Sequence, residues 1–171
     1  LESLKGKSVE HTRRYHSPSG AETVPAKVAL ENLKTGAQYP ALADDDFERL
    51  GNAIHSWLGA LPSARSLDGK TMESVALRCL NSFGMTDILA PADLVAMGKE
   101  LERWIEDKYP DATWSTEVAL SSRRSEGGQW VGFADLLLFL PDSKVVIVDH
   151  KSAPIAPTQC EAKAQSYAGQ L

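Results

Sequence analysis

The sequence predicts an α/β fold in which a helical region precedes a mainly antiparallel central sheet. Over residues 41–110, apolar residues recur at the three- and four-residue spacing of amphipathic helices. Beyond this region the period changes to strand-like alternation, and turns containing Gly or Pro separate the apolar stretches. We therefore expect a helical part over 41–110, and a three-strand meander with a C-terminal helix over 111–171.

Three helices are expected in the first part. A run of three aspartates, placed where a helix dipole favours negative charge, opens a helix expected over residues 44–60. A second helix is expected from an N-cap at Thr71 to a stop at Gly84. A third begins with Pro91, which suits a first helical turn, and ends before Pro110.

Three strands and a last helix are expected in the second part. Residues 114–121 alternate between the two faces of a strand, whereas WVGFADLLLFL (130–140) is apolar on both faces, as in a buried strand. VVIVDHK (145–151) is the third strand. After a loop interrupted by Pro, Thr158 is expected to cap the C-terminal helix, so that helices flank the sheet.

Residues 1–40 are expected to form a linker or arm, because Ser, Pro, Gly and basic residues leave only brief apolar periodicity there. With 171 residues, the chain is long enough for about one domain. The first residue is not Met, and the final YAGQL stops in mid-pattern. We therefore expect a piece of a longer polypeptide.

Charge and cysteine content exclude several classes of protein. The chain has 18 Lys and Arg against 23 Asp and Glu, so no general basic surface is available to hold nucleic acid. Its two cysteines form no disulfide framework and its start lacks a secretory signal, which predicts a cytoplasmic location. The longest apolar stretch is about half of the ~20 residues that span a bilayer, so no membrane span is expected.

Two acids in the most apolar strands are the most informative residues. Asp135 lies within GFADLLLFL, and Asp149 follows VVIV. Burying an ionised carboxylate costs several kcal/mol, so each acid needs a cation, a metal ion or a set of hydrogen-bond donors. Lys151 is one candidate partner, because it lies two residues after Asp149 on the same strand face. His150 is expected to point away from that face.

The strand register decides whether the two acids share a face. They do so only if paired positions across the PDSK turn add up to an even number, which pairs Asp135 with Asp149 or with Lys151. An even sum requires a loop of odd length or a bulge. A plain two-residue turn gives an odd sum and separates the acids.

Four sequence elements, taken in order, resemble the RecB-like branch of the PD-(D/E)XK nucleases. The resemblance covers about residues 44–171. It implies that residues 41–171 form a nuclease domain with a restriction-endonuclease-like core, whose last strand is missing from the chain. The four elements are a helix histidine at His55, Gly-x-x-Asp ending at Asp135, Asp-x-Lys at Asp149 to Lys151 and Tyr-x-x-Gln-Leu from Tyr167 to Leu171.

The resemblance implies metal-dependent cleavage of DNA. His55, Asp135 and Asp149 would be metal ligands, and oxygen-rich ligation with one imidazole suits Mg²⁺ or Mn²⁺. Asp149 and Asp135 would then be catalytic together with Lys151, which supplies a cation to the pentavalent phosphate or orients the attacking water. A related subgroup of these nucleases binds an iron–sulfur cluster through four cysteines, one of which lies ahead of the helix histidine. Because no cysteine precedes Cys79, no such cluster is expected.

Five further residues are candidates for the site. Glu117 matches the acid expected on the first strand, although a polar residue there often only faces solvent. Gln170 resembles a glutamine that contacts DNA or the catalytic water, and Tyr167 one turn earlier belongs either to this motif or to the core. Arg123 and Arg124 precede a Gly-Gly turn, where they either touch DNA phosphates or form a solvated hairpin tip.

The resemblance favours a metal-dependent deoxyribonuclease, acting as exonuclease or endonuclease, in a RecB-like or AddA-like helicase–nuclease. DNA and a helicase domain are then the expected partners, and DNA end processing and recombinational repair the expected context. The alternative is a catalytically inactive nuclease-like module that binds DNA or docks a subunit. A third possibility is a structural α/β module in which Asp149 and Lys151 form an ion pair.

Overall fold

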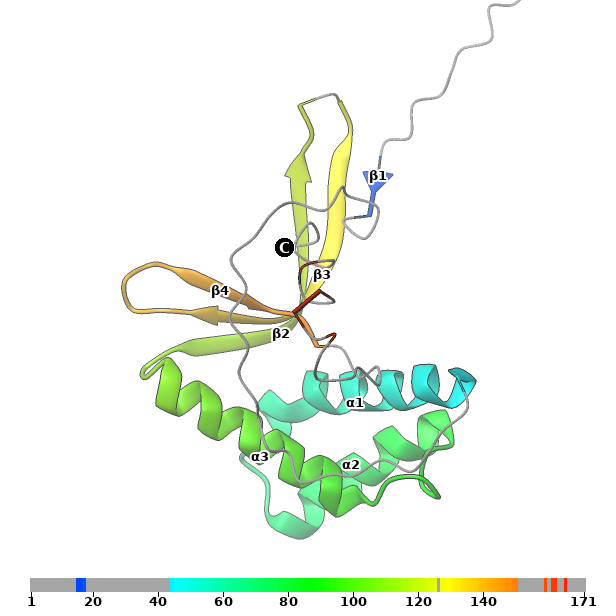
Figure 1. Ribbon diagram of the computed structural model, residues 1–171. Helices are drawn as coiled ribbons and strands as arrows, with labels where there is room; N and C mark the ends of the chain where they lie inside the picture. The colour runs from blue at the N-terminus through cyan, green and yellow to red at the C-terminus, as the bar shows by residue number, and fades with distance from the viewer. Residues whose placement is uncertain are drawn as a thin grey trace, which may run out of the picture.

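The computed structural model describes residues 15–17, 44–125, 127–150, 159, 161–162 and 165. These residues form an α/β fold in which three helices lie below a small sheet in the view of Figure 1. The expected C-terminal helix and its cap at Thr158 fall almost entirely outside the described residues. The elements are β1 (Tyr15–His16), α1 (Asp44–Ala64), α2 (Gly69–Phe83), α3 (Pro91–Lys108), β2 (Thr113–Arg123), β3 (Gln129–Phe139) and β4 (Val145–Val148).

The helices enclose the main hydrophobic core. α1 runs one turn beyond its expected end, to Ala64, and most of its apolar stripe is buried against α2 and α3. Among the helices that the structure describes, none has the length and apolar character needed to cross a bilayer. The largest side chains with almost no exposed surface are Leu50, Ile54, Trp57, Leu61, Leu80, Met85, Leu94 and Leu138.

The N-cap of α2 is Asp68, and the expectation that Thr71 caps this helix is wrong. One oxygen of Asp68 accepts hydrogen bonds from the backbone N–H groups of Lys70 at 3.0 Å and Thr71 at 3.1 Å. The other oxygen accepts the Thr71 hydroxyl at 2.6 Å. Because the carboxylate reaches two backbone donors of the first turn, the helix begins two residues before Thr71.

Replacing Asp68 with alanine is expected to lower the melting temperature at pH 7 by roughly 2–6 °C. The hydrogen bond from the Thr71 side chain, followed by its backbone N–H, holds the pKa of Asp68 below its usual value. The contribution of Asp68 to stability is therefore present above the unfolded-state pKa of about 3.9 and is lost as the pH falls through the folded-state pKa. Thermal melting at several pH values measures this effect, which should shrink toward acid pH.

An exposed aspartate in the connection between α2 and α3, Asp87, provides the matched control. Asp87→Ala removes the same charge without removing a helix cap. Equal shifts in melting temperature for Asp87→Ala and Asp68→Ala would show that the capping hydrogen bonds contribute nothing.

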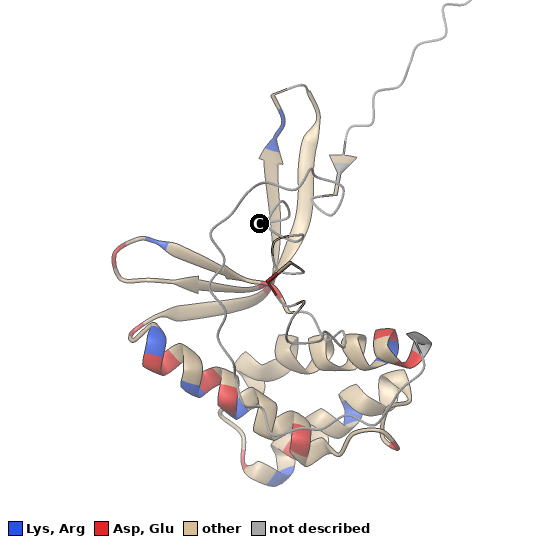
Figure 2. Ribbon diagram, viewed as in Figure 1, with Lys and Arg blue, Asp and Glu red and all other residues tan. Residues whose placement is uncertain are grey.

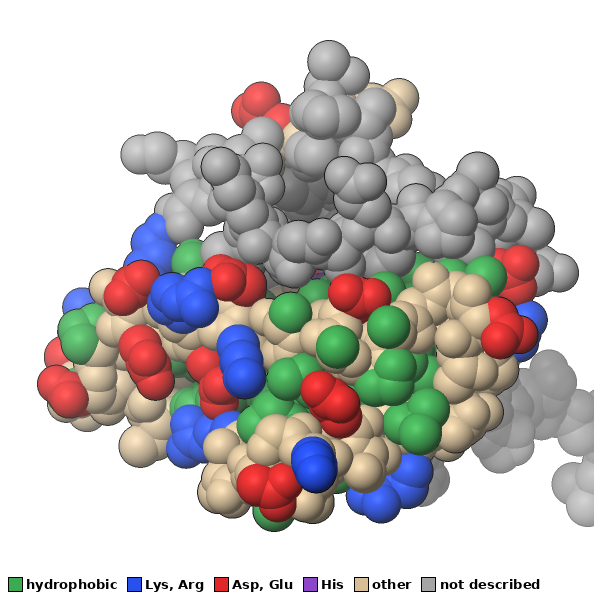
Figure 3. Space-filling view, turned by 90° about the horizontal axis from the view of Figure 1, so that it is seen from below, with side chains coloured by type: hydrophobic (Ala, Val, Ile, Leu, Met, Phe, Trp, Pro, Cys, Tyr) green, Lys and Arg blue, Asp and Glu red, His purple; other side chains and the backbone are tan. Residues whose placement is uncertain are grey.

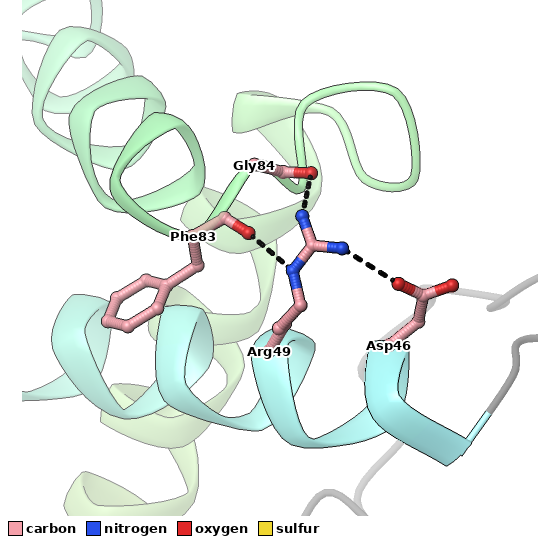
Figure 4. Close-up of polar contacts among 4 residues, drawn as sticks. All are labelled: Asp46, Arg49, Phe83 and Gly84. Atoms are coloured by element: carbon pink, nitrogen blue, oxygen red, sulfur yellow. Dashed lines mark hydrogen bonds and ion pairs between the residues drawn. The ribbon is translucent and has the colours of Figure 1, made fainter.

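A guanidinium group joins α1 to the end of α2 (Figure 4). Arg49 donates from Nε to the carbonyl of Phe83 and from Nη2 to the carbonyl of Gly84, each at 3.1 Å, and it pairs with Asp46 at 3.0 Å. Gly84 stops α2 as expected, with a φ of 64°. A Cβ at this position would lie 2.5 Å from Nη2 of Arg49, so glycine also permits the arginine to approach.

β3 is the central strand of the sheet. β2 pairs with it antiparallel along its length, while β1 and β4 share its other edge. β4 pairs antiparallel with the second half of β3, which gives the expected three-strand meander. β1 was not expected, because it lies in the arm, where it pairs in parallel with the start of β3.

β3 and β4 pair in the register that Asp135 and Asp149 require, in which the numbers of paired residues add up to an even number. Leu136 pairs with Val148, the last residue of β4, which gives such an even sum. The connection is a three-residue loop, in which the N–H of Leu140 donates to the carbonyl of Lys144 at 2.9 Å. Ser143, the last loop residue, has a φ of 65°, as in hairpins whose type I turn ends in a left-handed residue. The predicted odd loop length is therefore confirmed.

β3 is buried only in its second half, so the prediction of a strand buried on both faces is wrong for its first half. Leu136 and Leu138 pack on Ile105 of α3, whereas Phe133 is 73% exposed. Figure 1 shows the reason: the β2–β3 pair turns away from β4 and from the helices near its middle. We call the projecting part, residues 118–134, the distal hairpin.

Candidate metal centre

The ladder between β2 and β3 is interrupted where two acids face each other. The pairs Thr116 with Leu136 and Val118 with Ala134 flank this point in one register, which sets Glu117 opposite Asp135. Glu117 has a φ of 52°, a left-handed backbone that is uncommon and costly for residues other than glycine. The chain therefore holds a strained backbone at the position where the hairpin bends.

The left-handed backbone turns Glu117 toward α1. The hydroxyl of Thr116 donates to the carbonyl of Gly59 at 3.0 Å. Cγ of Glu117 lies 3.3 Å, and its Oε1 3.8 Å, from the place that a Cβ on Gly59 would occupy. Regular alternation sends consecutive side chains to opposite faces of a strand. Thr116 and Glu117 both reach the same helical residue because the backbone at Glu117 breaks this alternation.

Three ligating side chains from three elements meet at this bend. His55 of α1, Glu117 of β2 and Asp135 of β3 each offer one donor atom, and these atoms lie within 4.8 Å of one another. Nδ1 of His55 is 3.6 Å from Oδ2 of Asp135. Within the described part of the chain, this is the one group of three such side chains at that spacing. We call this candidate site the metal centre.

The donor set fits a hard divalent cation. One imidazole nitrogen and two carboxylate oxygens suit Mg²⁺ or Mn²⁺. Ligands of an octahedral Mg²⁺ lie roughly 3.0 Å apart when adjacent and roughly 4.2 Å apart when opposite, so the three donor atoms, which lie within 4.8 Å of one another, would have to move closer together to bind one ion. The side chains of His55 and Asp135 are 30% and 20% exposed and Glu117 is exposed, which leaves room for water to complete the coordination.

A residue without an expected role supports the centre. The backbone N–H of His150 donates to Oδ2 of Asp135 at 2.6 Å, and the His150 ring meets the His55 ring edge to face, with centroids 5.4 Å apart. Contacts of this kind orient metal ligands. The prediction that His150 points away from the face of Asp149 assumed a strand that continues through residue 151, whereas β4 ends at Val148 and strand alternation does not reach His150.

The Asp-x-Lys motif is only partly described. Asp149 directly follows β4 and is half-buried, and its carboxylate lies outside the group of three donor atoms. Lys151 lies outside the described residues, as do Tyr167 and Gln170 of the last motif. Their expected roles remain predictions.

The two arginines near the hairpin tip have different surroundings. Arg123 ends β2 and is exposed. The guanidinium of Arg124 lies over the ring of Trp130, 4.8 Å from its centroid. Whether the two residues touch DNA phosphates, as the sequence suggests, remains a prediction.

Comparison with known proteins adds no relative. A scan against protein-family models finds none that matches the chain, and a search of the curated proteins finds no match either. The function of the chain therefore has to be inferred from the chemistry of the three side chains that meet at the bend and from the sequence motifs.

Proposed function

We propose that the chain is a divalent-metal-dependent deoxyribonuclease domain of the RecB-like PD-(D/E)XK type, with a restriction-endonuclease-like core. The observation that carries the proposal is the convergence of His55, Glu117 and Asp135 at the bend of the sheet. The Gly-x-x-Asp motif delivers Asp135 to this point, and β3 and β4 pair in the even register, with Leu136 opposite Val148, that the Asp-x-Lys motif needs to share a face with it. The interpretation of the sequence as a nuclease requires both this position of Asp135 and this strand register.

The charges of the side chains at this position favour a bound cation over a group that has only a structural role. Like charges directly opposite each other on paired strands are destabilising, and Glu117 faces Asp135 in this way. Among the described residues, no Lys or Arg forms an ion pair with either acid. A divalent ion between the two carboxylates and the imidazole removes the repulsion and accounts for the strained backbone that brings Glu117 in.

The residues of the chain have separate tasks in the proposed reaction. A bound Mg²⁺ or Mn²⁺ supplies charge neutralisation at the phosphate and lowers the pKa of a coordinated water. His55, Asp135 and Glu117 would hold the cation, and the N–H of His150 fixes the orientation of Asp135. Lys151 stabilises the charge of the pentavalent phosphate or orients the water, as its motif implies.

The net charge of the chain supports a role within a larger protein or complex. A formal charge of −5 gives little general attraction for DNA. A helicase domain in the same polypeptide or complex would deliver the strand to the centre, as in the processing of broken DNA ends during recombinational repair.

Cleavage of a plasmid and of end-labelled oligonucleotides, with Mg²⁺, Mn²⁺ or chelator, tests the proposal. We expect cleavage with either ion, none with chelator, and loss of cleavage in Asp149→Ala, because that acid belongs to the Asp-x-Lys motif. The melting temperature should rise with Mn²⁺ in the wild type, since a ligand that binds the folded state stabilises it.

Three other results would redirect the assignment. Mn²⁺ binding without cleavage of any DNA would favour the inactive module that binds DNA or docks a subunit. No shift in melting temperature with either ion, and no cleavage, would favour a structural α/β module. Unchanged cleavage in Asp149→Ala would remove the reaction from this site.

A further inference from the structure

One face of the distal hairpin is open from its tip to the metal centre. Directly paired residues on neighbouring strands point to the same face of a sheet. On this face every side chain is exposed except that of Asp135, which is half-buried. From the tip inward, the pairs that form this open face are Arg123 with Gln129, Ser121 with Val131 and Ala119 with Phe133. Asp135, two residues after Phe133 on β3, connects this face to the metal centre.

The most exposed large apolar side chain of the described residues lies next to the centre on this face. Phe133 is 73% exposed, more than any other such residue. It precedes Asp135 by two residues on β3, so the two residues share a face with Cα atoms roughly 7 Å apart. An uncovered aromatic ring at this distance from a candidate phosphate-cleaving centre is placed to stack on a nucleobase.

The charge of the distal hairpin suits a polyanion better than the rest of the chain does. Residues 118–134 carry Arg123 and Arg124 against Glu126, in a chain with a balance of −5. Figure 2 shows basic residues near the hairpin tip and acidic residues at the bend. The described helical surface seen from below in Figure 3 mixes acidic and basic side chains without an extended basic patch.

We propose that the open face binds one unpaired DNA strand and leads it to the metal centre. Arg123 holds a phosphate near the tip, Phe133 stacks on a base, and the next phosphate lies over Glu117 and Asp135. A single strand is favoured over a duplex because stacking on Phe133 requires a base whose face is free. The destination of the strand rests on the proposed function, whereas the contacts at Arg123 and Phe133 require no metal.

Binding of labelled oligo(dT) to the whole chain in chelator tests the inference through fluorescence anisotropy. An oligonucleotide of about 12 residues covers a site of this size. Phe133→Ala is expected to weaken binding by roughly 5–100-fold, the range for loss of one stacked base, and Phe133→Tyr to restore most of it. Phe139→Ala, at the other end of β3, is the matched control, because Phe139 is 42% exposed but lies outside the open face.

Binding and cleavage separate this inference from the nuclease proposal. If the chain binds oligo(dT) through Phe133 but cuts no DNA with Mg²⁺ or Mn²⁺, the inference stands and the nuclease proposal fails. If the chain cuts DNA while Phe133→Ala binds oligo(dT) as the wild type does, the inference fails alone. It also fails if the wild type does not bind oligo(dT), or binds a blunt duplex of the same length equally well.

Discussion

Replacing Asp135 with asparagine is expected to reduce metal-dependent DNA cleavage by at least about 100-fold, beyond the 10–100-fold that loss of a supporting residue costs at a metal site. Asparagine keeps the size of the side chain and an oxygen that can still accept the N–H of His150. The variant therefore removes the negative charge while preserving the local hydrogen bond. Mn²⁺ affinity, measured by calorimetry, should fall together with the cleavage rate.

The same variant should have the opposite effect on the metal-free chain. Because Asp135 faces Glu117 across the strand pair, removing one charge relieves their repulsion and should raise the melting temperature in chelator by about 1–4 °C. Asp142→Asn is the control, since Asp142 is exposed in the β3–β4 loop, where its carboxylate pairs with Lys144. Wild-type Mn²⁺ affinity in Asp135→Asn would place the metal elsewhere.

Local chemistry made the helices and one strand register predictable. Pro91 and Gly84 mark helix ends through backbone restrictions that depend little on the rest of the fold. The even register followed from a different requirement, that Asp135 and Asp149 share a face, and a three-residue loop supplies it. The cap of α2 was misplaced because Asp68 and Thr71 are both good N-cap residues, and the hydroxyl of Thr71 serves the carboxylate instead.

The remaining features depend on contacts between distant parts of the chain. Nothing in the sequence around Glu117 indicates a left-handed backbone, because glutamate has no preference for that conformation. The role of His150 comes from its backbone N–H, which every residue except proline carries. The apolar run around Phe133 predicts burial, but burial also requires a covering element, and the described helices lie elsewhere.

Replacing Gly59 with alanine is expected to stabilise α1 and at the same time weaken the metal centre. Alanine is favoured over glycine inside a helix by about 1 kcal/mol, which should raise the melting temperature in chelator. Its Cβ, however, would lie 3.3 Å from Cγ of Glu117, so this side chain has to move by a few tenths of an ångström. We expect Mn²⁺ affinity to fall by about 10–100-fold, as for other changes beside metal ligands.

The glycine at the start of α2 supplies the control for this substitution. A Cβ on Gly69 would meet no atom within 4 Å, so Gly69→Ala should leave Mn²⁺ affinity unchanged. In a Glu117→Gln background, Gly59→Ala should cause little further loss, because the two changes act through one ligand. Additive losses would mean that Gly59 affects the centre by another route, such as His55, which lies one helical turn earlier on the same face of α1.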